Sequence, residues 1–255
     1  MRILVVGGRG FAGRFLTGAL ARRGDEIVTL DRGEPTPAAP FDAVIDANGD
    51  ARRFWAETHP GESFQANVAS VAERVGGLRY ERYVFLSTVD VYGRNRGSRA
   101  GTREDSTVAP EGMDTYAFHK WLAERFVSFH ARRHLILRLG TLLGPGLKKN
   151  PVFDALSGLP IRQPAASTLN LVHLETVAEA LARLLTAGAD GVWNVAAGAP
   201  ITVAAMLQSA APGRTHAFHP ELLSTDYDVE VGKIASILPM PSSADALARY
   251  LSGPR

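Results

Sequence analysis

The chain has 255 residues, of which 45% are hydrophobic and 21% charged, an ordinary composition for a soluble globular protein. Its formal net charge of +2 is too small, without a concentrated basic run, to indicate a nucleic-acid-binding protein. The absence of cysteine excludes disulfides, thiolate zinc sites and cysteine nucleophiles. With no signal-like start and no apolar stretch of membrane-spanning length, we expect a cytoplasmic protein without a membrane partner.

Strands and helices alternate over the first half of the chain. The pattern predicts strands at residues 3–6, 26–30, 41–46, 83–87 and 135–139, and helices at 11–23, 64–75 and 115–133. This order is typical of an α/β fold with a Rossmann-type doubly wound parallel sheet and helices on both faces.

The alternation becomes irregular after Gly144-Pro145-Gly146. Strands are predicted at residues 171–173 and 192–195, helices at 176–186, 203–210 and 244–251, and loops over most of 212–241. We therefore expect a dinucleotide-binding domain over residues 1–145. Residues 146–255 are expected to form mainly a small C-terminal α/β substrate lobe, interleaved with late Rossmann elements.

A glycine-rich turn connects the first predicted strand to the first predicted helix. Gly7, Gly10 and Gly13 permit a tight turn and close approach of the backbone to a pyrophosphate, which the N-terminus of a helix beginning at Phe11 would face. Glycines that merely close a strand–helix turn are the alternative interpretation. The context favours a dinucleotide, because Asp31 ends the next predicted strand at the expected spacing of about 20 residues.

The identity of the cofactor depends on two neighbouring residues. Asp31 suits the ribose hydroxyls of NAD and would repel a 2′-phosphate, whereas the adjacent Arg32 offers a positive charge that would accept one. We predict NAD and keep NADP as the alternative.

A candidate proton-handling site follows from one helix and one strand. Tyr116 and Lys120 are four residues apart, so they share a helix face, and a nearby ammonium would lower the pKa of the phenol. Ser87 and Thr88 end a strand at the sheet edge where ligands of such folds bind, and a hydroxyl there would hold a substrate oxygen. An amphipathic helix with an exposed lysine is the alternative, but lysine is rare in this chain.

Several motifs occur in a fixed order along almost the whole chain. They are the glycine turn, Phe85-Leu86-Ser87-Thr88-Val89-Asp90-Val91-Tyr92-Gly93, the Tyr116–Lys120 pair, Leu137-Arg138-Leu139-Gly140, Asn170-Leu171-Val172-His173 and Gly191-Val192-Trp193-Asn194-Val195. This set resembles the extended short-chain dehydrogenase/reductases, the NAD-dependent epimerase/dehydratase family that acts on nucleotide sugars.

The resemblance implies roles for individual residues. Thr88 and Tyr116 would hydrogen-bond the sugar oxygen at the reacting carbon, and Lys120 would bond the nicotinamide ribose. The cofactor groove would be lined by Asn48, Gly49, Asn67 and Ser87. Relatives also pair the helices predicted at residues 64–75 and 115–133, which implies a homodimer.

The chain departs from the family pattern at two places. Only the short segment 33–40 separates Asp31 from the strand at residue 41, so one sheet strand is expected to be missing. The family's 4,6-dehydratases carry Asp-Glu directly after the Thr, whereas this chain has Val89-Asp90. The resemblance therefore favours a nucleotide-sugar 4-epimerase or a protein similar to dTDP-4-dehydrorhamnose reductase over a 4,6-dehydratase.

Other candidate residues keep open roles. Asp90 is either a ligand of a substrate hydroxyl or a capping residue, and Asn150 is a candidate substrate contact in the C-terminal lobe. His119 is expected to be exposed, His173 to cap the following helix, and the histidines to form no metal site.

The predicted function is NAD(P)-dependent reduction or epimerisation at C4 of a nucleotide-linked sugar. Two alternatives remain: a non-catalytic dinucleotide-binding regulatory protein on the same fold, and an RNA-associated relative, which the mild charge disfavours.

Overall fold

The computed structural model describes residues 1–253 and divides the chain into two compact units. The first, here called the Rossmann unit, consists of Met1–Arg94, Thr107–Arg138 and Ala178–Trp193. The second unit consists of Asn95–Ser106, Leu139–Val177 and the chain from Asn194 onward. No helix within the described residues is both long and apolar enough to cross a membrane.

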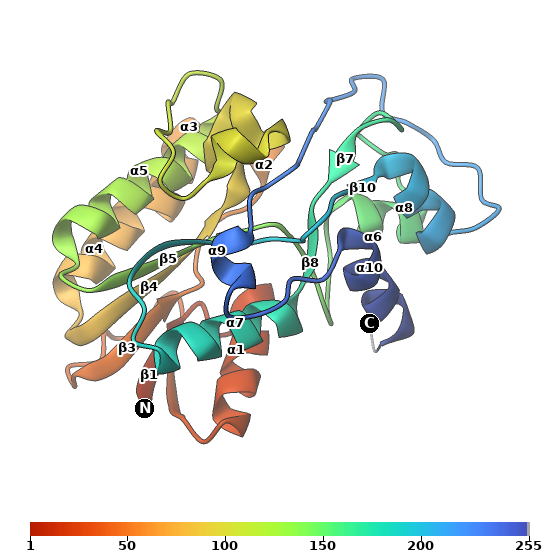
Figure 1. Cartoon of the computed structure of the whole chain (residues 1–255). Helices are drawn as coiled ribbons and strands as arrows, with labels where there is room; N and C mark the ends of the chain where they lie inside the picture. The colour runs from red at the N-terminus through yellow and green to blue at the C-terminus, as the bar shows by residue number, and fades with distance from the viewer. Residues whose placement is uncertain (254–255) are drawn as a thin grey trace. The chain divides into compact units, whose positions relative to one another are not determined.

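A six-stranded parallel sheet forms the centre of the Rossmann unit, as predicted (Figure 1). Its strands, in spatial order, are β2 (Glu26–Leu30), β1 (Arg2–Val6), β3 (Phe41–Asp46), β4 (Tyr80–Thr88), β5 (His134–Leu139) and β9 (Gly191–Val195). Strands of such sheets are buried on both faces, which explains runs such as Ile3-Leu4-Val5-Val6, all less than 9% exposed.

The sheet lacks one strand of the usual fold, as the short segment 33–40 led us to expect. The usual dinucleotide-binding order, 3-2-1-4-5-6, places a third strand outside the second. Here β2 is at the edge, residues 33–40 contain no strand, and the chain returns on the other side of β1 as β3. The end of β2 therefore stands beside a short loop instead of another strand.

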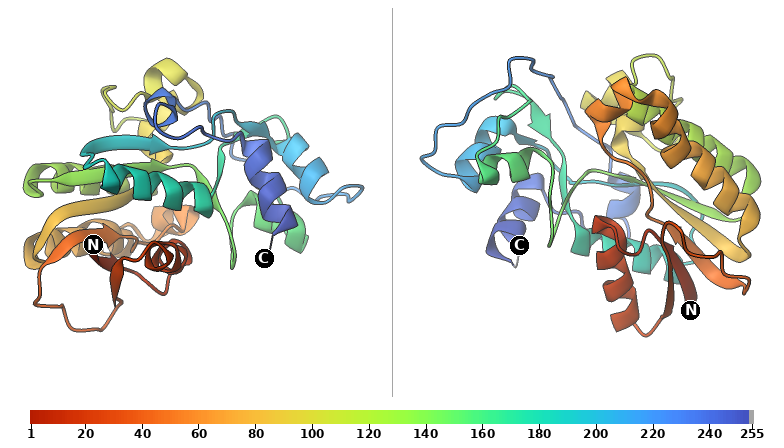
Figure 2. Two further views of the ribbon diagram at one scale, coloured as in Figure 1. Left: turned by 60° about the horizontal axis from the view of Figure 1, so that its bottom comes forward. Right: turned by 180° about the vertical axis from the view of Figure 1, so that it is seen from behind.

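Helices cover both faces of this sheet (Figures 1 and 2). On one face lie α1 (Phe11–Arg22) and α7 (Leu174–Thr186), joined by a hydrogen bond from Arg23 to the carbonyl oxygen of Ala182. On the other lie α4 (Ser70–Gly77) and α5 (Thr115–His130), whose apolar side chains pack with those of β1, β3, β4 and β5 in one buried cluster.

The connection from β3 to β4 differs from the single helix predicted at residues 64–75. It contains α2 (Arg53–Thr58), α3 (Pro60–Phe64), a π-helical turn (Gln65–Ala69) and then α4. Pro60 suits the first position of α3, where its missing N–H costs nothing. The π turn places Asn67 in the interior, 1% exposed, and such turns occur frequently at functional sites.

Two 3₁₀ segments, Val89–Gly97 and Arg99–Thr102, follow β4. The second unit contains two small two-stranded sheets and several short helices, in agreement with the expected α/β lobe. Its elements are β6 (Thr141–Leu143), α6 (Pro151–Ser157), β7 (Thr168–Leu169), β8 (Leu171–His173), β10 (Ile201–Thr202), α8 (Val203–Ala210), α9 (Gly232–Ala235) and α10 (Ser243–Ser252). Short strands carry little periodicity, so β6, β7 and β10 were missed, although the equally short β8 was predicted; α6 and α9 were also missed.

Candidate active site

The glycine turn after β1 has the geometry of a phosphate-binding turn. Gly7 has a φ of +77°, and a side chain on it would press against the backbone of Asn48. A Cβ on Gly13 would overlap the carbonyl oxygen of Gly7, so the first turn of α1 packs directly on the turn. Within the described residues, no side chain caps the N-terminus of α1 at Gly10, and its first turn carries no acid. Its N–H groups and positive dipole end are therefore available to an anion.

A cavity of about 770 Å³ lies beside this turn, at the carboxyl ends of β1, β2 and β3. Its lining includes predicted cofactor residues: Asp31, Arg32 and Asn48. The Oδ2 atom of Asp31 is buried and has no hydrogen-bond partner among the described residues. An acceptor left open in this way fits a ribose hydroxyl, and together with the uncapped helix it shows that these residues fit a dinucleotide.

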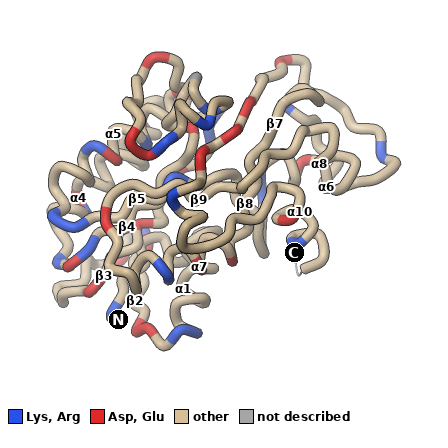
Figure 3. Tube along the Cα trace, viewed as in Figure 1, with Lys and Arg blue, Asp and Glu red and all other residues tan. Residues whose placement is uncertain are grey.

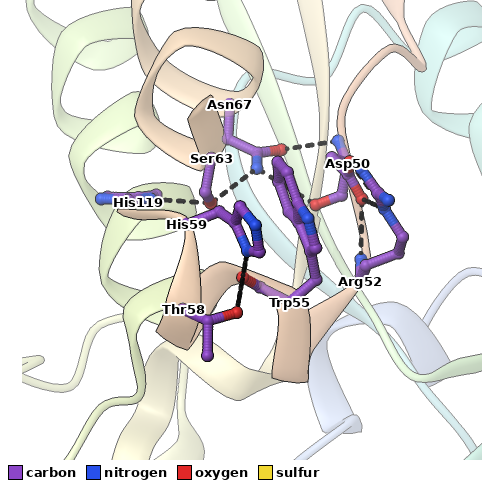
Figure 4. Close-up of polar contacts among 8 residues, drawn as sticks. All are labelled: Asp50, Arg52, Trp55, Thr58, His59, Ser63, Asn67 and His119. Atoms are coloured by element: carbon purple, nitrogen blue, oxygen red, sulfur yellow. Dashed lines mark hydrogen bonds and ion pairs between the residues drawn. The ribbon is translucent and has the colours of Figure 1, made fainter. Parts of the chain in front are cut away.

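Asn67 and the backbone after β3 form a continuous hydrogen-bond network (Figure 4). The Asn67 Oδ1 atom accepts the N–H of Asp50 at 3.0 Å, and its Nδ2 donates to the Asp50 carbonyl at 3.1 Å. A Cβ on Gly49, whose φ is +150°, would lie 2.8 Å from Asn67 Oδ1. The structure therefore joins Asn67 to the backbone at Gly49 and Asp50, and the assignment of Asn48, Gly49 and Asn67 to a cofactor groove stays a prediction.

The same network corrects the prediction that His119 is exposed. His119 is only 6% exposed, and its Nδ1 lies 2.9 Å from the hydroxyl of Ser63, which also contacts Asn67 (Figure 4). Burial lowers the pKa of His119, so the imidazole is neutral near pH 7. His173 was predicted correctly as a cap: it precedes α7, and its Nδ1 accepts the N–H of Glu175 at 3.3 Å.

Thr88 and Asp90 interact directly at the end of β4. The Thr88 hydroxyl donates to the Asp90 carboxylate at 3.1 Å, and the N–H of Asp90 donates back to the Thr88 oxygen at 3.2 Å. The other carboxylate oxygen of Asp90 is 3.8 Å from the guanidinium of Arg53 on α2. Asp90 therefore orients the Thr88 hydroxyl, and its contact with a substrate hydroxyl stays a prediction.

Two side chains of α2 hold the start of α5, and neither was singled out from the sequence. Arg53 forms an ion pair with Asp114, whose carboxylate caps α5 by accepting the N–H of Ala117 at 2.8 Å. Glu57, one helical turn after Arg53, accepts both the N–H and the hydroxyl of Thr115 at 2.8 Å. The residues immediately before Tyr116 are thus fixed from outside their own helix. The i, i+4 spacing of Arg53 and Glu57, which places both side chains on one helix face, was the one sequence signal that could have indicated their shared role.

The predicted lowering of the Tyr116 pKa is wrong for this structure. Burial raises that pKa above its ordinary value, and the charges of Asp90 and Asp114 raise it further, with Arg53 opposing them. The ammonium of Lys120 donates instead to the carbonyl oxygen of Leu86 at 2.7 Å. The phenol is therefore protonated at neutral pH.

Lys120 is almost fully buried, with 4% of its surface exposed. Its Nζ lies 3.9 Å from the centre of the Phe85 ring. Burial lowers the pKa of Lys120 to about 8, although Asp46 and Glu124 partly oppose the change. A buried lysine with a perturbed pKa at the edge of an α/β sheet is typical of a functional group.

Two other predicted residues have structural partners. The buried hydroxyl of Ser87, assigned to the cofactor, donates to Glu124 at 2.6 Å, and Glu124 also binds Arg138. Asn150, the candidate substrate contact in the second unit, caps α6: its Oδ1 accepts the N–H groups of Val152 and Phe153, each at 3.0 Å. These contacts account for both residues without a ligand, and their ligand roles stay predictions.

The model of the family described as "NAD dependent epimerase/dehydratase family" matches residues 3–196, which contain the glycine turn, Thr88, Tyr116 and Lys120. No curated protein matches the sequence.

Solved structures of similar fold cover almost the whole chain. MoeE5 in complex with UDP-glucose and NAD is 21% identical, with a TM-score of 0.79 over 98% of this chain and 97% of that one. The UDP-glucose 4-epimerase of Thermus thermophilus in complex with NAD is 24% identical, with a TM-score of 0.71 over 98% and 93% of the two chains. TunA, an NAD-dependent NDP-hexosamine 5,6-dehydratase, is 20% identical, with a TM-score of 0.82 over 98% and 96%. At these identities the likeness establishes the fold.

Proposed function

Because the chain belongs to the NAD dependent epimerase/dehydratase family, we propose that it is an enzyme that reduces or epimerises a nucleotide-linked sugar at C4. The observation that supports this proposal is the set of contacts near the carboxyl end of β4: Thr88 bonds Asp90, whose charge acts on Tyr116, and Lys120 bonds the Leu86 carbonyl. The cavity beside the glycine turn lies at the same edge of the sheet. NAD would supply a hydride acceptor or donor when bound at the glycine turn, with Asp31 at its ribose.

Thr88 and Tyr116 are the groups we assign to the sugar oxygen at the reacting carbon. Asp90 holds the Thr88 hydroxyl in place, and the carboxylate of Asp90 is close enough to Tyr116 to influence its pKa. A protonated Tyr116 can donate a proton to an oxygen on which negative charge develops as a carbonyl is reduced. At neutral pH Tyr116 is thus in the protonated form that donation in the reducing direction requires.

Lys120 is the group we assign to the nicotinamide ribose. Within the described residues its ammonium is held at the end of β4 by a single hydrogen bond to Leu86, and an ammonium has three donors. Two donors therefore remain for other partners.

Elimination of water is not part of this proposal. The 4,6-dehydratases that the chain resembles carry an acid directly after the Thr, whereas here that position holds Val89, which is 3% exposed. Asp90, the next residue, is occupied by Thr88 and faces Arg53. These contacts favour a positioning role for Asp90 over transfer of a proton to a leaving hydroxyl.

The substrate we expect is a nucleotide sugar, and the enzyme is expected to work as a homodimer. Two of the solved structures of this fold contain a uridine diphosphate sugar together with NAD, which supports that substrate class. Exposed aromatic side chains on α5, among them Phe118 at 37% and Phe129 at 85%, provide an apolar surface for a second copy.

The test is a turnover assay on the purified protein. Retained NAD is measured first, then oxidation of NADH and NADPH with a 4-keto sugar nucleotide; release of the cofactor in each cycle indicates a reductase and retention an epimerase. The Tyr116→Phe variant should lose about a hundredfold of the activity or more, since acid–base groups contribute at least this much. Tyr80→Phe is the matched control, because its hydroxyl bonds the carbonyl of Val75 at the edge of the unit, away from the cavity and from Thr88.

Two results would contradict the proposal. Near-normal turnover by Tyr116→Phe would exclude the mechanism. Tight binding of NAD without turnover of any sugar nucleotide would favour the non-catalytic alternative on the same fold.

A further inference from the structure

A group of three charged side chains lies at the exposed end of β2. Arg9, in the glycine turn, donates from Nη2 to Glu34 Oε1 at 2.6 Å, and its Nε is 3.7 Å from Asp31 Oδ2. The second oxygen of Glu34 accepts the backbone N–H of Asp31 at 2.8 Å. Asp31 and Glu34 both line the cavity beside the glycine turn. The group therefore stands where the adenosine ribose of a dinucleotide would lie.

The three side chains differ in how firmly they are held. The Glu34 side chain is 33% exposed and is fixed by its bond to the Asp31 backbone, whereas the Arg9 side chain is 78% exposed. Arginine pairs well with phosphate, in bidentate geometry. Without Glu34, the exposed guanidinium of Arg9 would lose its closest ion-pair partner and would be free to turn toward a 2′-phosphate on a ribose bound at this end of β2.

We propose that Glu34 makes the cofactor site selective for NAD over NADP. Its carboxylate engages Arg9, the group that would otherwise bind a ribose 2′-phosphate, and adds a second negative charge beside Asp31. Glu34 can occupy this position beside Asp31 because β2 is at the edge of the sheet. The chain turns directly after β2, and the Glu34 side chain folds back onto the backbone of Asp31. The inference rests on the proposed function only in requiring a dinucleotide at the glycine turn.

The expected size of the effect follows from charge. A phosphomonoester carries close to two negative charges, so replacing one nearby carboxylate and releasing one guanidinium removes a repulsion and adds an attraction. We expect Glu34→Gln to tighten NADPH binding about tenfold or more and to change NADH binding less than about threefold. The glutamine keeps a side-chain oxygen that can accept the Asp31 N–H, so the loop is expected to fold.

The experiment measures the dissociation constants of NADH and NADPH with the full-length protein, by fluorescence titration in the absence of substrate. Glu26→Gln is the matched control: Glu26 lies at the opposite end of β2, pairs with Arg2 at 3.0 Å and does not line the cavity. It changes the net charge by the same amount and should alter neither constant. Adding Arg9→Met to Glu34→Gln should return NADPH affinity to the wild-type value.

The outcomes separate this inference from the proposed function. An unchanged NADPH constant in Glu34→Gln, with NADH binding intact, would overturn it. So would a gain that survives Arg9→Met but disappears with Arg32→Ala, since Arg32 also lines the cavity and would then be the phosphate-binding group. Failure of the wild-type protein to bind either nucleotide would overturn the cofactor site itself.

Discussion

Buried polar residues lie both in the first two turns of α5 and in its third turn, but the hydrogen bonding of these residues differs between the two regions. In the third turn Glu124, fully buried, accepts two bonds from Arg138 at 3.0 and 2.7 Å and one from Ser87 at 2.6 Å. In the first two turns no described residue gives the Tyr116 hydroxyl a hydrogen bond, and Lys120 has a single acceptor among them, the Leu86 carbonyl.

The comparison shows how one helix combines a structural and a functional role. A buried charge whose hydrogen bonds are satisfied stabilises the arrangement of α5, β4 and β5, and its pairing leaves little capacity for a ligand. Groups that are buried but underpaired have perturbed pKa values and free capacity, which are the properties a reaction requires. Substitutions in the two regions should therefore affect different measurements.

The largest expected effect concerns stability. Glu124→Ala leaves Arg138, 2% exposed, without its buried partner, and removing one member of a buried pair costs about 3–5 kcal/mol. Urea denaturation of the Glu124→Ala and Glu179→Ala variants compares the free energy lost with this buried ion pair with that lost with an exposed one. Glu179 bonds Arg183 at 2.7 Å on the surface of α7, so its loss should cost less than about 1 kcal/mol. Equal losses would refute the contrast between the two regions of α5.

The Lys120→Met substitution should affect activity rather than stability. We expect it to lower activity about a hundredfold and to leave the free energy of unfolding within about 1 kcal/mol of wild type. The pH dependence provides a second readout. Because folding lowers the pKa of Lys120 from 10.5 to about 8, the ammonium loses its proton above about pH 8, and wild-type kcat/KM should decline there.

The same shift predicts the pH dependence of stability. Between about pH 8 and 10.5 the unfolded chain binds more protons at Lys120 than the folded one, so the contribution of this residue to stability rises with pH across that window. Lys120→Met should lack both this rise and the decline in kcat/KM. A variant that is inactive because it is unfolded would contradict the assignment of Lys120 to function.

A smaller effect is expected from Arg53, which lies outside α5 but fixes its first turn. Arg53→Gln removes the partner of Asp114 and the positive charge that opposes the raised pKa of Tyr116. We expect kcat to fall about tenfold with little change in KM, since a positioning residue acts on the transition state more than on binding. Arg53→Lys should recover part of the loss, and Arg22→Gln, on the surface of α1, should have no effect. A change confined to KM would assign Arg53 to substrate binding instead.

Charge is distributed along the chain in both signs (Figure 3). Composition alone made nucleic acid an unfavourable partner, and the structure shows where the charges are used: Arg74 pairs with the buried Asp46 at 2.8 Å, and Arg82 and Arg133 share Asp190 at 3.0 Å. These three arginines are thus held by ion pairs within the Rossmann unit.

The sequence by itself determined the parallel Rossmann sheet, the bounds of β2 and β3, the phosphate-binding turn and the absence of a strand after Asp31 in the segment 33–40. These features depend on local properties: the period of the apolar residues, the backbone freedom of glycine and the length of one loop. The grouping of Thr88, Tyr116 and Lys120 stays a prediction from the sequence, based on the rule that parallel strands and their helices bring such positions to one sheet edge.

Only the tertiary structure decided how these groups are charged and held. His119 is buried against Ser63, 56 residues earlier, and Asp114 pairs with Arg53, 61 residues earlier. The pKa of Tyr116 is raised because the phenol is partly withdrawn from solvent and because Asp90 and Asp114 come close to it, while Lys120 turns to the Leu86 carbonyl. The spacing of residues in a sequence fixes which face of a helix they occupy, but burial and the pairing of distant segments fix the energy of a charge.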